Sequence, residues 1–423
     1  MQYHITASVD PTKSELTAKA VLHLEEAPLT DELTLRINPN LQVACVRFRG
    51  IECGFSQTEA GRVVINLPAV VATVQPSLEV EYAGELAQYD AAGEQMRAFI
   101  NEDFFWLRDD QLWFPMLASQ QAEMLPVPPG RCIVQMAVPA GWEVAASASL
   151  IDDGTEGEWR CYRWDTQRAY SGLSVVGGTL QRHNDGKCTF LWLTPRLDLA
   201  QSVLDALGFY EEILGPCPHA DLTVVMGPSF LPGGYADRGL IHVGENKLTV
   251  RTLAHELVHQ WWGRGVWAQG HGDRWLTEGL AGYLSLHYAE SRGESVLDET
   301  LETYREAYGQ AVATWGDKPL AEVNSEDYER TGLVSALIYK KGAWLHWMLH
   351  SLLGDRYFQA LQAICAEYGG KPITTTQYIA ELVAICEDQS EAIQIWAQQW
   401  LYAPGLPGLT IQIDKSNASP DRE

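Results

Sequence analysis

The sequence contains few basic residues for its length. It has 30 Lys and Arg residues against 55 Asp and Glu residues, which gives a formal net charge of -25 at pH 7. Proteins that bind nucleic acids or anionic membranes generally do so through basic surfaces. The composition therefore argues against nucleic acid as a partner, and the excess of acidic groups favours solubility.

Long apolar runs are also lacking. No stretch reaches the roughly 20 apolar residues that a membrane-spanning helix needs. The N-terminal stretch, residues 1–28, has no basic segment followed by an apolar one, as a secretory signal would have. We therefore expect a soluble protein, located in the cytoplasm, with no insertion into a membrane.

Paired cysteine motifs are missing as well. The eight cysteines include no Cys-x-x-Cys pair and no Cys and His at the spacing of metal ligands. Without a signal peptide, the simplest prediction is reduced thiols rather than a disulfide framework. The cysteines are Cys45, Cys53, Cys132, Cys161, Cys188, Cys217, Cys365 and Cys386.

The chain has 423 residues, which is too long for one ordinary core, so two domains are expected. The first, residues 1–182, has segments in which apolar and polar residues alternate, separated by Gly, Pro, Asn and Asp. This pattern predicts an all-β domain. The expected strands lie within residues 17–27, 32–39, 45–50, 62–68, 77–86, 132–148 and 170–180.

The second domain is expected at residues 183–412, where apolar residues recur every three or four positions, as in amphipathic helices. The fold class is therefore α+β and multidomain. Strands are expected at 188–193 and 220–227, a turn near Asp388, and a disordered polar tail at 413–423. The expected helices lie within 197–215, 248–262, 277–293, 299–315, 333–354, 356–370 and 375–405.

One stretch of the second domain, HELVH at residues 255–259, has the spacing of a metal site. Residues four apart on a helix share a face, so His255 and His259 can both present ring nitrogens to one zinc ion. Glu256 lies roughly 100° round the helix axis. It is too far round to be a ligand, but it is placed to act as a general base toward water at the metal.

The His-Glu-x-x-His pattern alone also arises by chance on ordinary helices, so the surrounding residues decide whether it indicates a zinc site. Bulky apolar residues flank this helix and predict its burial, and buried histidines and carboxylates need polar partners. A catalytic zinc also needs a third protein ligand. Glu278, which begins the next expected helix, is the best candidate, because the intervening loop lets that helix return beside the first. The flanking residues are Leu253, Leu257, Val258, Trp261 and Trp262.

These residues resemble the aminopeptidase N family of gluzincin metallopeptidases. The family pattern is His-Glu-x-x-His, eighteen residues, then Glu, and here eighteen residues, 260–277, separate His259 from Glu278. The family also surrounds its third ligand with Trp-Leu-x-Glu-Gly, as found at 275–279. The resemblance implies a saddle-like all-β N-terminal domain followed by a thermolysin-like catalytic domain, in a short form that lacks the large helical C-terminal domain.

The resemblance extends to a later helix. The family has a catalytic tyrosine in a Tyr-x-Lys-Gly stretch, and Tyr339 takes this position in IYKKG. A phenol at this place can donate a hydrogen bond to the oxyanion that forms when water attacks a carbonyl. Taken alone, Tyr339 is better interpreted as a core aromatic residue, so the catalytic assignment depends on the resemblance.

The sequence departs from the family at the site that binds the substrate's α-amine. The family has Gly-Ala-Met-Glu-Asn before a Gly-Leu-Ile strand, whereas this chain has GGYADRGLI, with Gly233 aligned and Ala236 in place of the glutamate. An ammonium group in a cleft with little water needs a carboxylate. The expected substrate-binding residues of this edge strand are Gly233, Gly234, Tyr235, Ala236 and Asp237.

Other carboxylates are candidates for the missing charge. Asp237 is one position on, but alternation along a strand directs its side chain to the other face. Glu102, with Asp103 beside it in the β domain, is an alternative, because the family also takes an amine-binding residue from that domain. For the second nitrogens of the ligand histidines, Asp273 and Glu290 are candidate partners, although each is as readily a surface charge. His271 reads as a loop histidine.

Three functions remain open. The first is a zinc-dependent aminopeptidase with altered amine recognition, using Glu256 as the base and Tyr339 at the oxyanion. The second is a peptidase of internal or N-blocked bonds, and the third is a catalytically weak binding or assembly module that keeps the zinc fold. In the first two, the partner is a peptide or protein substrate. The sequence leaves the oligomeric state open.

Overall fold

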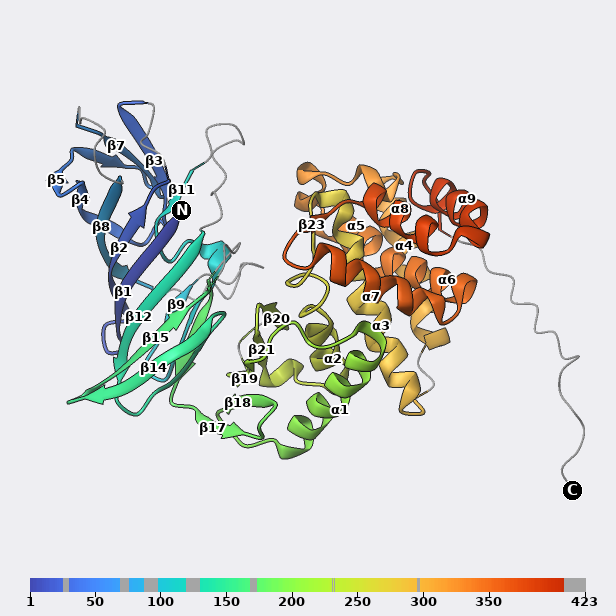
Figure 1. Cartoon of the computed structure of the whole chain (residues 1–423), viewed down its shortest axis with the longest axis horizontal. Helices are drawn as coiled ribbons and strands as arrows, with labels where there is room; N and C mark the ends of the chain where they lie inside the picture. Colours follow the sequence, from blue (N-terminus) through green and yellow to red (C-terminus); the bar gives the residue numbers. More distant parts are fainter. Residues whose placement is uncertain are drawn as a thin grey trace, which may run out of the picture. The chain divides into compact units, whose positions relative to one another are not determined.

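The computed structural model describes residues 1–25, 30–68, 76–86, 98–118, 130–167, 173–229, 231, 233–294 and 297–406. Strands come first in the chain and helices follow, in blue to green and in green to red in Figure 1. The predicted α+β class is thus confirmed. The expected boundaries at 182 and 412 stay a prediction, and the expected tail at 413–423 lies outside the described residues.

The N-terminal region is built on an eight-stranded sheet. Buried and more exposed residues alternate along β1, β2 and β12, because successive side chains of a strand point to opposite faces. Its order is β14 (Ser149–Glu156), β15 (Trp159–Asp165), β12 (Arg131–Pro139), β1 (Gln2–Asp10), β2 (Glu15–His23), β8 (Ser77–Glu85), β4 (Gln42–Phe48) and β5 (Ile51–Glu52).

Strand β1 was not predicted from the sequence. It pairs in parallel with β12, with Gln2 opposite Arg131, and antiparallel with β2. Two four-stranded sheets complete the region. One has the order β13 (Glu143–Ala146), β16 (Val175–Gly178), β10 (Phe104–Leu107), β9 (Phe99–Ile100); the other has the order β11 (Met116–Leu117), β3 (Glu32–Arg36), β7 (Arg62–Asn66), β6 (Phe55–Gln57).

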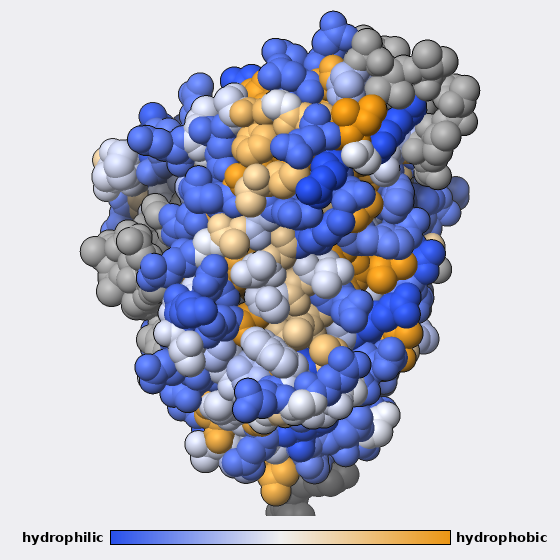
Figure 2. Space-filling view, turned by 90° about the vertical axis from the view of Figure 1, so that its left-hand side faces the viewer, coloured by the Kyte–Doolittle hydropathy of each residue, from blue (hydrophilic) through white to orange (hydrophobic). Residues whose placement is uncertain are grey.

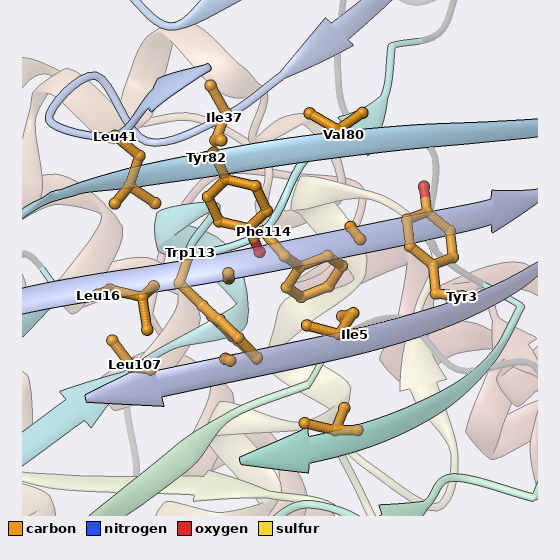
Figure 3. Close-up of a cluster of buried hydrophobic side chains, with 14 of the residues drawn as sticks. Tyr3, Ile5, Leu16, Ile37, Leu41, Val80, Tyr82, Leu107, Trp113 and Phe114 are labelled. Carbon is orange, nitrogen blue, oxygen red and sulfur yellow. The ribbon is translucent and has the colours of Figure 1, made fainter. Parts of the chain in front are cut away.

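The core of these sheets is apolar and contains several aromatic rings (Figure 3). Tyr3 of β1 packs edge-on against Phe114, with ring centroids 5.8 Å apart, and its hydroxyl accepts a hydrogen bond from the Leu117 amide. The buried Trp113 indole donates to the Leu173 carbonyl. The Tyr3 oxygen and the Trp113 N–H thus each have a hydrogen-bond partner within the apolar core, whereas the buried Tyr82 hydroxyl has none among the described residues.

A five-stranded sheet follows, with the order β17 (Gln181–Asn184), β18 (Cys188–Trp192), β19 (Leu222–Gly227), β21 (Leu240–Gly244), β20 (Gly234–Asp237). Strands β18, β19 and β21 run parallel, and β20 returns antiparallel to β21. Within the described part of the chain, β20 is therefore an edge strand. Its outer backbone groups lie where an extended peptide can pair with them.

Helices form most of the remaining chain. Two of them differ from expectation. The helix expected at 248–262 ends at Val258, with His259 as its C-cap, and the helix expected at 333–354 contains a π-helix, Ser335–Lys341. The turn expected near Asp388 is present. The helices are α1 (Leu197–Leu214), α2 (Val250–Val258), α3 (Glu278–Ser291), α4 (Leu297–Trp315), α5 (Thr331–Val334), α6 (Gly342–Leu353), α7 (Arg356–Tyr368), α8 (Thr375–Ile385) and α9 (Ser390–Trp400), with a short pair β22 (Trp267–Ala268) and β23 (Pro372–Ile373).

The chain divides into two compact units. One comprises Met1–Gly208 and Cys217–Gln260, and the other comprises Phe209–Pro216 and Trp261–Glu423. On the face shown in Figure 2, hydrophilic residues predominate and apolar residues form separate patches among them. Among the described residues, no helix combines the length and the apolar character that crossing a membrane requires.

Candidate metal centre

Helix α2 carries the two histidines on a short, well-anchored segment. The Thr249 side chain caps its first turn by accepting a hydrogen bond from the Thr252 amide. Buried Leu253 and Leu257 fix the apolar face of the helix. His255 and His259 lie one turn apart, with ring centroids 4.9 Å apart and planes at 88°. Although His259 is the C-cap, its backbone is still helical, so the spacing of four residues keeps both rings on one face.

Glu278 begins α3 and completes a cluster of three possible ligands. One ligand atom from each of His255, His259 and Glu278 lies within 4.8 Å of the other two. Two imidazole nitrogens and a carboxylate oxygen form a donor set that suits zinc and leaves a fourth coordination position open. The three side chains therefore fit the ion that the sequence predicts.

Glu256 lies beside this cluster on the same helix and is 7% exposed. Strand β20 approaches it closely, since a Cβ atom built at Gly234 would lie 2.4 Å from Glu256 Oε1. Gly234 itself has no side chain, so this close packing is allowed. The arrangement places an acid-base group beside both the possible metal ligands and the edge strand.

The edge strand presents different side chains to its two faces. Ala236 is two positions from Gly234 and so shares the face that meets Glu256, while Tyr235 and Asp237 point the other way. Ala236 is 5% exposed and Asp237 is fully buried. Gly233 precedes the strand with φ +42°, a conformation that favours glycine.

The turn after β20 is held by Gln260, which the sequence analysis missed. Its Oε1 accepts a hydrogen bond from the Gly239 amide at 2.9 Å, and its Nε2 donates to the Asp237 carbonyl at 3.0 Å. Gln260 is fully buried and directly follows His259. The side chain therefore links the end of the histidine helix to the edge strand through two hydrogen bonds.

Glu102 and Asp103 lie in the turn between β9 and β10, and both side chains are exposed. The turn is fixed by Asn101, whose Oδ1 accepts hydrogen bonds from the Asp103 and Phe104 amides. Contacts to β20 come instead from Arg108, whose guanidinium lies 4.3 Å from the Tyr235 ring centroid. A role for Glu102 or Asp103 in binding an amine stays a prediction.

Tyr339 lies in the π-helix Ser335–Lys341 and is 38% exposed, although its neighbours Leu337 and Ile338 are buried. Single turns of π-helix are rare and occur frequently at functional sites. The exposed phenol is consistent with a role toward a bound substrate, and it argues against the alternative that Tyr339 is a core aromatic residue.

Arg274 is a second residue that the sequence analysis missed. Its Nη2 lies 3.4 Å from Glu278 Oε1, and its guanidinium stacks on the Tyr328 ring at 5.4 Å. Burial lowers the pKa of Arg274, but the nearby Glu278, Tyr328 and Tyr339 outweigh this effect and leave the pKa above its usual value. In the sequence, the spacing of four residues between Arg274 and Glu278 could have indicated that these two side chains lie close together.

The proposed partners of the ligand histidines have other roles. Asp273 accepts hydrogen bonds from the Gly270 and Thr375 amides, so it stabilises the loop before Glu278. Glu290 is exposed on α3, and His271 packs on the Tyr328 ring at 4.8 Å. The same loop is anchored by His346 of α6, whose Nε2 bonds to the Trp275 carbonyl at 3.1 Å.

Comparison with known families identifies the region around this cluster. Residues 218–400 match the description "Peptidase family M1 domain". They form a peptidase family M1 domain. The resemblance to the gluzincin aminopeptidases is thereby confirmed at the level of the M1 family, and the predictions of a metallopeptidase and of one zinc ion agree with it.

Relatives of the M1 domain include several curated proteins. The chain is 28% identical to Aminopeptidase M1-B of Oryza sativa subsp. japonica over 52% of its own length and 26% of that protein's. It is 24% identical to the leukotriene A-4 hydrolase of Xenopus laevis over 58% of this chain and 44% of that protein. It is 23% identical to Probable aminopeptidase 1 of Sulfurisphaera tokodaii over 82% of this chain and 47% of that protein. The chain thus matches less than half the length of each.

Solved structures share the fold over nearly the whole chain. An M1 zinc metallopeptidase from Deinococcus radiodurans superposes with a TM-score of 0.72 at 21% identity, covering 97% of this chain and 95% of that one. Native yeast LTA4 hydrolase superposes with a TM-score of 0.72 at 18% identity, covering 97% of this chain and 69% of that one. The predicted order of a β-rich domain followed by a mainly helical domain is therefore an M1 architecture.

Proposed function

We propose that this chain is a zinc-dependent peptidase that hydrolyses peptide bonds, with an altered site for the substrate's N-terminal amine. The observation that carries the proposal is the cluster of His255, His259 and Glu278 within a matched M1 domain. One Deinococcus radiodurans relative is described in complex with a Tyr-Ser-Ala substrate, which supports a peptide as the substrate class.

In this proposal His255, His259 and Glu278 hold the ion, which when bound supplies Lewis acidity to the reacting carbonyl and water. Glu256 takes a proton from the attacking water and later delivers it to the leaving amine. Its burial favours this role, because a carboxylate in a site with little water interacts strongly with developing charge. The Tyr339 hydroxyl donates a hydrogen bond to the oxyanion.

Substrate positioning is assigned to the edge strand. An extended peptide that adds to β20 forms main-chain hydrogen bonds along Gly234–Asp237, antiparallel or parallel to the strand. Gly234 keeps the strand close to Glu256, so the pairing delivers the scissile bond to the base. Gly233 and Tyr235 flank this path.

Whether the enzyme removes N-terminal residues depends on Ala236. The methyl group of Ala236 shares the face that meets Glu256 and provides no charge for an α-ammonium. An aminopeptidase then requires Asp237, Glu102 or Asp103 to bind the amine. A peptidase of internal or N-blocked bonds requires none of them, and the apolar Ala236 specifically favours this second candidate.

The test is hydrolysis of a peptide library with free and N-acetylated members by the zinc-loaded protein, with the products read by mass spectrometry. Glu256→Gln is expected to abolish cleavage while zinc stays bound. The control Glu290→Gln makes the same change on the exposed surface of α3.

The products distinguish the candidates. Stepwise loss of N-terminal residues from free peptides alone supports an aminopeptidase with a rebuilt amine site. Internal cuts, or equal cleavage of acetylated peptides, support the second candidate. Absence of any cleavage that depends on Glu256 contradicts the peptidase proposal and leaves a binding or assembly module that keeps the zinc fold.

A further inference from the structure

Arg274 places a positive charge at the centre of the proposed chemistry in a chain whose net charge is -25. It lies in the 3₁₀-helix His271–Leu276, one turn before Glu278, and its side chain is 41% exposed. It interacts electrostatically with both Glu278 and Tyr339. The guanidinium is thus close to a possible metal ligand and to the expected oxyanion donor, and it remains open to solvent.

Most hydrogen-bond donors of Arg274 are unused within the described part of the chain. A guanidinium has five N–H donors. Its one contact to a carboxylate there is the 3.4 Å approach to Glu278 Oε1, which is long for a charged hydrogen bond. A metal ion bound by Glu278 would share this carboxylate with Arg274. The contact to Glu278 therefore does not satisfy all the N–H groups of the guanidinium.

Tyr328 adds a second unused donor at the same place. Its ring supports the Arg274 guanidinium, and its hydroxyl is buried without a hydrogen-bond partner among the described residues. An unpaired buried hydroxyl is unfavourable unless a ligand or water satisfies it. Arg274 and Tyr328 are therefore adjacent polar groups, one charged and one neutral, and among the described residues the carboxylate that faces them is Glu278, through the long contact to Arg274.

We propose that Arg274 and Tyr328 form a carboxylate-binding subsite, and that the substrates are peptides with a carboxylate close to the scissile bond. The inference rests on the proposed peptidase function and adds the chemistry of its substrate. The carboxylate comes from an acidic side chain or from a free C-terminus. Arg binds such a group through two parallel hydrogen bonds, which gives both affinity and orientation.

The charge distribution explains why a local cation is needed. Ala236 supplies no charge on the face of β20 that meets Glu256, so any charged contact to the substrate comes from another side chain. The overall acidic charge disfavours anionic peptides at long range, whereas an arginine at contact distance compensates for that locally. Selection for a carboxylate is therefore expected to depend on this one side chain.

The test compares four tetrapeptides that contain Glu or Gln at one position and end in a free acid or an amide. The readout is the ratio of kcat/KM for the acid form to that for its neutral counterpart, determined for each source of the carboxylate. Effects on zinc binding or on Glu256 are common to both peptides and cancel in this ratio. Zinc content is measured for every variant.

In the wild-type protein, the ratio of kcat/KM for the acid peptide to that for its neutral counterpart is expected to be about 10 to 100 for one of the two carboxylate sources. This is the usual effect of a hydrogen bond to a charged group. Arg274→Gln reduces that ratio to near 1. Tyr328→Phe reduces it by about 3- to 10-fold. Arg305→Gln, on the exposed surface of α4, makes the same charge change and leaves the ratio unaltered.

Two results overturn the subsite. One is a wild-type ratio near 1 for both sources of the carboxylate. The other is an Arg274→Gln variant that keeps the wild-type ratio while its kcat/KM falls equally for all four peptides, because Arg274 then positions Glu278 only. In both cases Glu256-dependent cleavage of the neutral peptides leaves the peptidase function standing.

A binding measurement decides the question even without turnover. The Glu256→Gln protein is titrated calorimetrically with the acid and neutral peptides, alone and combined with Arg274→Gln. Tighter binding of the acid form that is lost with Arg274→Gln supports the subsite whether or not any peptide is cleaved. Equal binding of both forms overturns it.

Discussion

A Cβ atom at Gly234 would lie 2.4 Å from Oε1 of Glu256, so the edge strand and the proposed base are in contact at a point where only glycine fits. The contact connects two segments that contribute differently to the proposed reaction. Strand β20 positions the substrate backbone, and Glu256 moves a proton. Their separation is therefore set by the lack of a side chain at Gly234.

Gly234→Ala is expected to lower kcat/KM by about 100-fold, because the new methyl group must displace the carboxylate or the strand by about 1 Å. The backbone of Gly234 does not have a positive φ, so the substitution does not by itself strain the strand. The measurement is kcat/KM together with the thermal midpoint. Gly309→Ala in α4, where an added Cβ meets nothing within 4 Å, is the control and keeps full activity. Full activity of Gly234→Ala would contradict the assigned position of the base.

Tyr339→Phe removes the hydroxyl group of a residue in the π-helix that is 38% exposed. If this hydroxyl stabilises the oxyanion, kcat falls by about 100- to 1,000-fold, as for the loss of other oxyanion donors. Because Tyr339 is 38% exposed, the free energy of unfolding should change by less than about 0.5 kcal/mol. Steady-state kinetics and urea unfolding test both parts. An unchanged kcat would show that the phenol is not a catalytic group.

The sequence predicted the cluster of possible ligands because regular spacing determines their positions. Residues four apart on one helix must share a face, so His255 and His259 were placed without knowledge of the tertiary structure. The helix that begins at Glu278 was also expected from the sequence, and the structure buries it on nearly all sides. Their convergence within 4.8 Å agrees with that reasoning.

Contacts between distant segments were not accessible from the sequence. The contact of Gly234 with Glu256 depends on how β20 packs on α2, and the pair of Arg274 and Tyr328 is separated by more than fifty residues. Strand β1 was missed although its partner β2 follows directly along the chain, and its pairing with the distant β12 could not be read from the sequence. The π-helix at Tyr339 could not be predicted, because the spacing of apolar residues in this segment is that of an ordinary α-helix.

Gln260→Met tests the link between the histidine helix and the edge strand. The substitution keeps the side-chain volume but removes the hydrogen bonds to the Gly239 amide and the Asp237 carbonyl. We expect the free energy of unfolding to fall by about 2 kcal/mol and KM to rise more than kcat falls, because β20 loses its anchor. Gln398→Met, on the exposed side of α9, is the matched control for denaturant unfolding and kinetics. Unchanged stability and KM would contradict the link.

Two buried histidines should make the protein sensitive to mild acid. Burial lowers the pKa of His242 and of His346 to about 3 in each case, from 6.5. Both rings are therefore neutral in the folded state across the neutral range. In the unfolded chain both rings take up a proton below pH 6.5. The contribution of the neutral, buried rings to the free energy of unfolding is therefore fully present above pH 6.5 and is lost as the pH falls toward 3.

His242 provides the cleaner test, because it packs 4.5 Å from the Trp106 ring and neither of its nitrogens has a hydrogen-bond partner among the described residues. Between pH 6.5 and 5, uptake of a proton by His242 in the unfolded chain should reduce the free energy of unfolding by about 2 kcal/mol, at 1.36 kcal/mol per pH unit. His242→Leu removes this part of the loss, whereas His183→Leu at an exposed position does not. Urea unfolding of the metal-free protein at both pH values excludes proton competition at the zinc ligands. An equal loss of stability in wild type and His242→Leu would show that the ring is solvated and able to accept a proton in the folded state.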